Sequence, residues 1–206
     1  MMRVMHTQRT SYHHGHLAES LLDAVDEIAS QFGLEAVTLR ACAKRVGVAP
    51  SSAFRHYEDK RALLTAFATR ALNQLVAALE SAEQQARRCG GNALHAVGLA
   101  YVGFALDKPA FFRAMWREET IYAQDADYVA ATRRLAGCIQ GGFARTLTDE
   151  DPETFSPQEL LAWSSVHGLA SLLIDGPLAK GKDREALMTA ATQMVQALDP
   201  ALDRPA

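Results

Sequence analysis

Residues 38–60 read TLRACAKRVGVAPSSAFRHYEDK, and this stretch predicts two short helices joined by a tight turn. Thr38 is a favourable N-cap residue for a first helix that ends before Gly47. Gly47 supplies the permissive backbone of a turn, and Pro50 suits the first turn of a second helix, where a missing N–H costs nothing. This pattern is typical of a helix-turn-helix element, which places its second helix in the major groove of DNA.

The second helix of this element is expected over about residues 49–56. Ala53 and Phe54 are placed to pack inward. The outer side then carries short polar and basic side chains, namely Ser51, Ser52, Arg55 and His56. A polar, basic outer face is what a helix needs in order to meet a DNA groove.

The segments around the element complete a three-helix head. Residues 1–12 lack periodicity and predict an arm. Apolar residues recur at helical spacing over about residues 15–32, up to Phe32, and Gly33 is placed to end that helix. A fourth, long helix is expected from Glu58 to about residue 87, since acidic residues favour a helix N-terminus.

Composition bounds the class of protein. The 206 residues are 49% hydrophobic with a net charge of −3, and no apolar run approaches the length of a membrane-spanning helix. Residues 1–61 hold eight basic and seven acidic residues and five of the seven histidines. The net negative charge of the chain therefore lies in residues 62–206. Three distant cysteines predict a reduced chain without a zinc site, and no secretory signal begins it.

Beyond Gly90 and Gly91, five further helical segments are expected. Ser156, Pro157 and Glu159 resemble a capping box that opens one of them, and Pro200 is placed to end the last. The expected segments are 93–106, 109–118, 126–147, 157–174 and 184–198. No convincing alternating strand is present, so the predicted fold is all-α with about nine helices: a helix-turn-helix domain over 1–61 and a helical body over 62–206.

Three stretches resemble the TetR/AcrR family of bacterial transcriptional regulators. Residues 38–64, TLRACAKRVGVAPSSAFRHYEDKRALL, match the family's helix-turn-helix pattern. Residues 12–33, YHHGHLAESLLDAVDEIASQFG, match its first helix. Residues 163–176, WSSVHGLASLLIDG, resemble the Trp-x-x-x-His-Gly signature of one C-terminal subgroup, which is called WHG.

The resemblance implies a homodimer that binds an operator on double-stranded DNA. It implies a repressor that a small-molecule effector releases. The cysteines and the lack of a spanning run predict a cytoplasmic chain, and we expect no enzymatic activity, no cofactor and no membrane partner. A ligand acts this way only if it prefers a state whose two heads are wrongly spaced for DNA. The fourth helix, whose apolar stripe runs from Leu63 to Leu79, is expected to transmit that displacement.

The match to the family pattern assigns the DNA-contacting residues. Arg40 is expected at a base edge, with a solvated surface arginine as the alternative, and Thr38 as a helix cap that also contacts phosphate. Phe54 lacks the hydroxyl of a tyrosine and is interpreted as packing. Bases or phosphates are the expected partners of the remaining head residues, namely Ser51, Ser52, Arg55, His56 and Lys60.

A cluster of Tyr12, His13, His14 and His16 precedes the first helix. Its spacing fits no closed zinc pattern, so the favoured interpretation of Tyr12 and His13 is contact with the DNA backbone rather than with a metal.

Aromatic residues of the body form the candidate pocket for a hydrophobic effector, with ordinary core packing as the alternative for any one of them. His167 is either a ligand contact or a core histidine with a satisfied hydrogen bond. The candidate pocket residues are Tyr101, Phe104, Phe112, Met115, Trp116, Trp163 and His167, with Phe111 and Tyr122 nearby in the same cluster. Dimerisation is assigned to segments 157–174 and 184–198, whose apolar faces alternatively only close the core of one chain.

Two other classes of protein remain as alternatives. An enzyme would use His95 or His167 with carboxylates such as Glu118 or Glu119, but no nucleophile–base arrangement or phosphate-binding glycine loop accompanies them. A helical protein-interaction module would not need the exposed basic face on a helix that starts with Pro50. Steeply salt-dependent binding to duplex DNA discriminates these classes.

Overall fold

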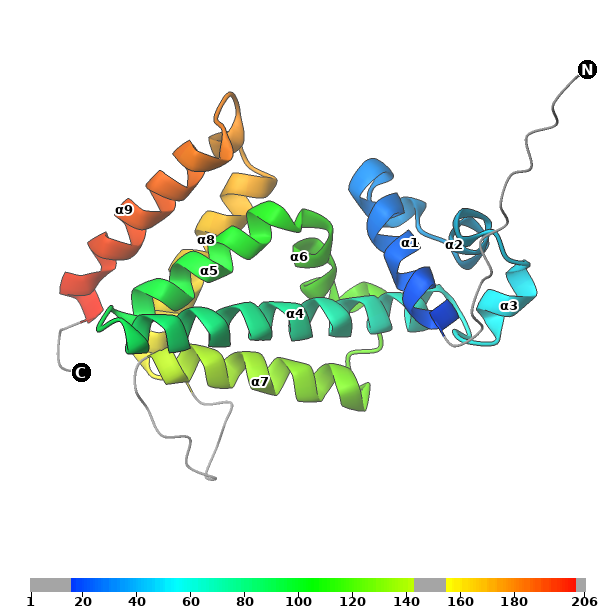
Figure 1. The fold of residues 1–206 in the computed structure, drawn as a ribbon, viewed down its shortest axis with the longest axis horizontal. Coiled ribbons are helices and arrows are strands. Elements are labelled where there is room, and N and C mark those ends of the chain that lie inside the picture. Colours follow the sequence, from blue (N-terminus) through cyan, green and yellow to red (C-terminus); the bar gives the residue numbers. More distant parts are fainter. Residues whose placement is uncertain (1–15, 143–154, 203–206) are drawn as a thin grey trace, which may run out of the picture. The chain divides into compact units, whose positions relative to one another are not determined.

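The computed structural model describes residues 16–142 and 155–202, and in these ranges all regular secondary structure is helical, which confirms the all-α prediction (Figure 1). Three short 3-10 turns, η2 (Leu34–Ala36), η3 (Glu118–Thr120) and η4 (Pro177–Ala179), join some of the helices. The nine α-helices of the described ranges are α1 (Leu17–Phe32), α2 (Leu39–Val46), α3 (Pro50–Phe54), α4 (Lys60–Arg88), α5 (Ala93–Asp107), α6 (Pro109–Met115), α7 (Ala126–Gly142), α8 (Pro157–Ile174) and α9 (Arg184–Leu202).

The chain divides into two compact units after Lys60, which we call the head (residues 1–60) and the body (residues 61–206). In the head, α1 packs against α2 and α3. The buried side of α1 is an apolar stripe at helical spacing that includes Leu21, Val25 and Ile28. Phe32 does not continue this stripe: its side chain is 67% exposed at the end of α1, so the expectation that it packs inward is wrong.

The turn between α2 and α3 has the geometry expected of its sequence. The Thr38 hydroxyl accepts a hydrogen bond from the backbone N–H of Ala41 at 3.0 Å and caps α2. Gly47 has φ +80° and ψ 27°, a left-handed conformation that glycine adopts without the steric cost of a Cβ. The next N–H, of Val48, bonds to the carbonyl of Ala43 at 2.9 Å and completes the end of α2.

Helix α3 is shorter than predicted, because Ala49 is its N-cap and the helix ends at Phe54. Ala53 is fully buried, whereas Phe54 is 47% exposed, so the interpretation of Phe54 as a packing residue is wrong. Successive residues of a helix point about 100° apart. In a helix of five residues, only one of these two neighbours faces the core.

In the body, α5 contacts α6, α7, α8 and α9. Gly98 of α5 permits a close approach, since a Cβ built there would lie 3.4 Å from Val166 of α8 and from Val195 of α9. Helices α4 and α7 run side by side (Figure 1), joined by hydrogen bonds from Arg134 to Asn73 and from Arg87 to the carbonyl of Gly141.

The capping box predicted at the start of α8 is confirmed. The Ser156 hydroxyl accepts a hydrogen bond from the Glu159 N–H, and the Glu159 carboxylate accepts one from the Ser156 N–H at 2.7 Å.

Other predicted helix boundaries differ in the structure. Helix α4 begins at Lys60, after Glu58 and Asp59, and α6 ends at Met115. Pro200 does not end α9, which continues to Leu202, because a proline in the last turn removes only one intrahelical hydrogen bond. The predicted end of α7 at residue 147 lies outside the described residues.

By length and composition alone, helix α4 is long and apolar enough to cross a membrane, which the sequence analysis did not expect. Of its most apolar 18-residue window, 56% is buried inside the protein, as in the core helix of a folded domain.

Candidate nucleic-acid interface and body cavities

The predicted DNA-contacting side chains of the head gather on the α2–α3 pair. Arg40 is exposed in the first turn of α2, and Ser51 is exposed in the first turn of α3. Ser52 is half-buried. Arg55 and His56 are exposed directly after α3. This part of the head therefore presents guanidinium, imidazole and hydroxyl groups to solvent, which are donors that DNA-binding proteins direct to phosphates and base edges.

Lys60 is engaged inside the head. Its Nζ donates hydrogen bonds to the carbonyls of Leu34 at 3.3 Å and Glu35 at 3.1 Å. These bonds attach the start of α4 to the 3-10 turn η2. An ammonium group has three N–H donors, so one donor remains for a phosphate.

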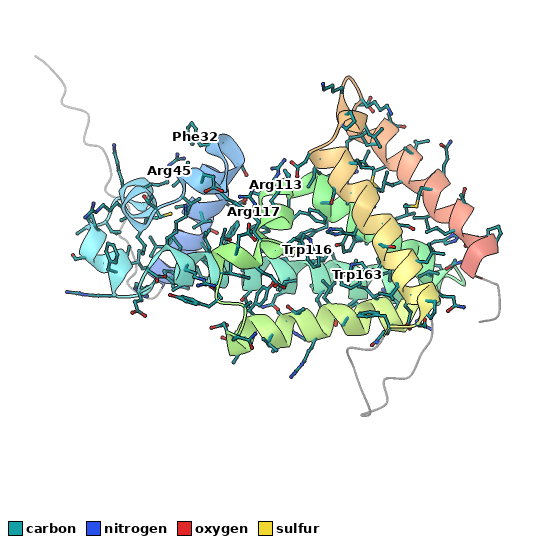
Figure 2. The ribbon with its side chains drawn as sticks, turned by 180° about the vertical axis from the view of Figure 1, so that it is seen from behind. Phe32, Arg45, Arg113, Trp116, Arg117 and Trp163 are labelled. Carbon is teal, nitrogen blue, oxygen red and sulfur yellow. The ribbon has the colours of Figure 1, made fainter. Side chains whose placement is uncertain are left out.

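The other basic residues of α2 differ from one another. Arg45 forms an ion pair with Glu27 of α1 at 2.9 Å, on the surface of the head (Figure 2). Lys44 is exposed. Nearby on the same helix, Cys42 and Ala43 are fully buried, and burial raises the pKa of the Cys42 thiol to about 11. Cys42 is therefore a protonated packing residue at neutral pH.

The predicted contacts at Tyr12 and His13, together with His14, lie outside the described residues. His16 is exposed and precedes α1. Within residues 16–142 and 155–202, no group of three or more His, Cys, Asp or Glu side chains is arranged to hold a metal ion.

In the body, the structure brings most of the predicted aromatic residues together. The Trp116 and Trp163 rings lie 6.0 Å apart (Figure 2), and the Phe112 ring is stacked on His167 at 5.4 Å. Tyr101 meets Phe112 edge to face at 5.8 Å. Edge-to-face and offset arrangements are the favourable geometries for such rings, so the cluster is a well-packed part of the core.

Two cavities large enough for a small molecule border this cluster. The α7–α8 cavity has a volume of about 470 Å³, with Trp116 and Trp163 in its wall beside Tyr128, Phe155, Glu118 and Arg133. The α6–α8 cavity has a volume of about 260 Å³, and its wall consists of Phe112, Arg113, Trp116, Arg117, His167, Ser171 and Asp175. A third cavity, beside Tyr101, Trp163 and His95, measures only about 30 Å³, which is room for a single water. Phe104 and Met115 are buried and line none of the three.

The protonation of His167 follows from its surroundings. Its Nδ1 lies 2.9 Å from the hydroxyl of Tyr101, and burial lowers the pKa of His167, which favours the neutral ring. Burial also raises the pKa of Tyr101, so its hydroxyl stays protonated. In the tautomer in which this hydroxyl donates a hydrogen bond to Nδ1, the other ring nitrogen, Nε2, carries the hydrogen of the neutral imidazole. His167 thus has the satisfied hydrogen bond considered from the sequence and also lies in a cavity wall, and its role as a ligand contact stays a prediction.

The residues of the enzyme alternative do not converge. His95 pairs with Asp199 at 2.6 Å, whereas His167 bonds to Tyr101. Glu118 and Glu119 lie on η3, and neither of them forms a hydrogen bond or ion pair with His95 or His167 in the described ranges.

Sequence analysis missed the polar half of the α6–α8 cavity. Arg113 of α6 binds Asp175 at 2.7 Å, and Arg117, Ser171 and Asp175 complete the wall. The available signal was the spacing: Arg113 and Arg117 are four residues apart around Trp116, and Ser171 is four residues after His167.

Known proteins match both units of the chain. Residues 21–67 match the model of bacterial regulatory proteins of the tetR family. Residues 94–195 match the model of the tetracyclin repressor-like C-terminal domain. The uncharacterized HTH-type transcriptional regulator YobS of Bacillus subtilis (strain 168) is 33% identical over 94 residues, which are 46% of this chain and 48% of YobS. The chain thus matches about half the length of this relative.

Solved structures have the same architecture. A protein with unknown function from Rhodococcus sp. RHA1 is 28% identical, with a TM-score of 0.66 over 90% of this chain and 97% of that one. The TetR family transcriptional regulator PfmR from Thermus thermophilus is 18% identical, with a TM-score of 0.63 over 89% of this chain and 99% of its own, which shows the shared fold.

A helix-turn-helix head joined to a helical body with cavities is the architecture of a DNA-binding transcriptional regulator. The chain belongs to the TetR family of these regulators. Members of this family act as DNA-binding transcription factors rather than as enzymes. Membership of the WHG subgroup stays a prediction.

Proposed function

We propose that this chain is a cytoplasmic, homodimeric repressor that binds a pseudo-palindromic operator and is released by a small, largely hydrophobic ligand. The observation that carries the proposal is the α2–α3 element, with a capped first helix, a left-handed glycine turn and exposed Arg40, Ser51 and Arg55. One such element reads only a few base pairs, so useful affinity needs two heads about 34–36 Å apart, or a multiple of that distance.

Exposed leucines of the body support the dimer. Leu161 and Leu172 of α8 are 39% and 47% exposed, and they are eleven residues apart, about three turns, so they lie on the same side of the helix. Leu173, Leu187 and Val195 are buried within one chain. The apolar faces assigned to dimerisation therefore divide into a part that closes the core and a part that is left for a partner.

The α7–α8 cavity supports the ligand. Its volume of about 470 Å³ lies within the range of small-molecule sites, roughly 300–1,000 Å³. Two tryptophans and Phe155 supply apolar wall, and Arg133 and Glu118 supply polar groups. Of the candidate pocket residues, Trp116 and Trp163 are the ones that border this cavity.

We propose that α4 carries the signal between the two units. This helix begins at Lys60, the last residue of the head, and continues to Arg88 in the body. Release requires the ligand to bind the DNA-incompetent state more tightly, because a ligand with equal affinity for both states shifts nothing.

The test is binding of the purified full-length chain to its own upstream intergenic DNA, followed by fluorescence anisotropy over a range of salt concentrations. A dimer that binds tightly and selectively, with affinity falling steeply as salt rises, supports the proposal. Weak binding that is indifferent to sequence, here and after selection from random sites, would contradict it.

Two variants locate the contacts. Arg55→Ala and Lys60→Ala should each lower the affinity and reduce the salt slope by about one. Arg88→Ala, at the exposed end of α4, is the matched control and should change neither. If neither Arg55→Ala nor Lys60→Ala has an effect, the assignment of this surface to DNA is wrong.

A further inference from the structure

The α6–α8 cavity differs in chemistry from the larger cavity beside it. Part of its wall is aromatic: Phe112 and His167 are stacked, and Trp116 stands edge to face against His167 at 4.9 Å. The same wall contains Arg113 and Arg117, which Figure 2 labels. The cavity therefore combines flat apolar surface with a concentration of hydrogen-bond donors.

The charged groups in the wall are two guanidiniums and one carboxylate, that of Asp175. Asp175 is already held by Arg113, with N–O distances of 2.6 and 2.7 Å. Its negative charge is thus compensated locally and does not oppose an incoming anion.

Two further donors face the same cavity. The Tyr101 hydroxyl occupies Nδ1 of His167, which leaves Nε2 as the ring nitrogen without a hydrogen-bond partner among the described residues. In the tautomer in which Tyr101 donates to Nδ1, this Nε2–H is a donor for a ligand. The hydroxyl of Ser171, one turn further along α8, also has none in the part of the chain that the structure describes. An imidazole N–H, a hydroxyl and an arginine fork suit a planar acceptor with two oxygens.

We propose that the α6–α8 cavity binds a small aromatic carboxylate, with its ring against Phe112 and Trp116 and its carboxylate toward Arg117, His167 and Ser171. A volume of about 260 Å³ is below the usual range for drug-sized ligands and fits a single ring with a short acid chain. The inference rests on the proposed function, since it adds a second ligand site to the proposed regulator, beside the α7–α8 cavity, and names the chemical class that this site takes.

The test uses three probes with the same ring: phenylacetate, its neutral analogue phenylacetamide, and the cation phenethylammonium. Trp116 and Trp163 are the two tryptophans of the chain, so quenching of tryptophan fluorescence reports binding at this cluster, and calorimetry confirms it. We expect saturable binding of phenylacetate, binding of the amide weakened roughly tenfold or more, and none of the cation.

Matched variants place the carboxylate. Arg117→Met should weaken phenylacetate binding by roughly 10- to 100-fold without changing amide binding. Ser171→Ala, a mild change that keeps the helix, should weaken it about two- to tenfold. Arg133→Met removes the same charge from the neighbouring α7–α8 cavity and should leave phenylacetate binding unchanged. Circular dichroism establishes that each variant is folded.

Three results would overturn the inference: no saturable phenylacetate binding up to roughly 10 mM, equal affinity for acid and amide, or equal losses in Arg117→Met and Arg133→Met. These readouts do not involve DNA. Operator binding without phenylacetate binding would reject the carboxylate site and keep the proposed regulator. Phenylacetate binding without DNA binding would keep the site and reject the regulator.

Discussion

In the head, the predicted DNA-contacting residues Arg40, Ser51 and Arg55 are exposed, whereas in the body the predicted pocket residues Tyr101 and Phe112 are almost fully buried. The head residues extend from short helices that their own caps define. The body residues take their positions from contacts among α5, α6 and α8, which come from separate parts of the chain.

This difference means that the two units should respond differently to substitution. Replacing an exposed head residue removes an intermolecular contact and leaves the fold in place. Replacing a buried body residue leaves a void in a close-packed interior, and stability falls before any specific function is lost. The following predictions test that contrast.

The largest expected effect is on a buried phenylalanine of the body. Phe111 is 2% exposed and packs edge to face on Phe67 at 4.6 Å. Phe111→Ala should lower the free energy of unfolding by about 3–5 kcal/mol, because the substitution leaves a cavity. Urea unfolding at fixed protein concentration measures it. Phe54→Ala is the matched change at an exposed head position and should cost less than about 0.5 kcal/mol. Similar losses at both sites would remove the contrast.

The next effect concerns DNA affinity alone. Arg40→Ala should cost about 1–3 kcal/mol of operator binding, roughly 5- to 150-fold in Kd, because one base contact is lost. Its unfolding curve should match that of the wild type. Anisotropy at constant salt measures the affinity, and Arg88→Ala controls for the loss of a positive charge. An affinity for Arg40→Ala equal to that of the control would make Arg40 a solvated surface residue.

Replacing a glycine by alanine should lower stability in the head and raise it in the body. Gly47→Ala places a Cβ at φ +80° and should destabilise the head by about 1–2 kcal/mol. Gly103→Ala lies inside α5, where the new Cβ would meet the Arg184 side chain at an ordinary 3.7 Å, and should stabilise by about 0.5–1 kcal/mol. Thermal unfolding of both variants gives the signs, and a stable Gly47→Ala would mean that the turn can rearrange.

Two helix caps provide a smaller and more closely matched comparison. Thr38→Ala and Ser156→Ala each remove a hydroxyl that accepts a backbone N–H and should each cost about 1 kcal/mol of stability. The Thr38 variant should also bind the operator more weakly, since we assign this hydroxyl to phosphate as well. DNA affinity that falls equally in both variants would show that Thr38 acts only through the stability of the chain.

The smallest effect is a pH dependence at His167. Burial lowers the pKa of His167 from 6.5, so the unfolded chain binds more protons than the folded one below that pH. Above pH 6.5 the His167 ring is neutral in both states and does not change the free energy of unfolding. As the pH falls below 6.5, the free energy of unfolding declines. His167→Gln should make the Tm less dependent on pH between about pH 7.5 and pH 5.5. An unchanged pH profile would mean that His167 titrates alike in both states.

Local signals predicted most of the helices. The capping box at Ser156, the N-cap at Thr38 and the turn at Gly47 appear in the structure as the sequence indicated. These features depend on residues within three or four positions of one another, which sequence displays directly. Periodicity failed at helix ends: Phe32 continues the apolar pattern of α1 but is exposed, because the last turn extends beyond the core.

The candidate sites were predictable to different degrees. The resemblance to the TetR pattern placed the head residues, and the structure leaves Arg40 and Arg55 exposed. In the body, aromatic composition pointed to a cluster that the structure brings together, without showing where space remains. Phe104 and Met115 are core residues that line none of the three cavities. Ser171 and Asp175, which the sequence analysis did not select, line the α6–α8 cavity.

The sequence alone predicts an all-helical chain with a helix-turn-helix head, because caps, turns and apolar periodicity are local properties of the chain. The resemblance to the TetR family comes from its motifs. Folding in three dimensions determined that Lys60 bonds inside the head and that Arg113 neutralises Asp175. It also placed His167 between Tyr101 and a cavity. Such pairings join residues tens of positions apart, and only the packing of whole helices against one another brings them within hydrogen-bond distance.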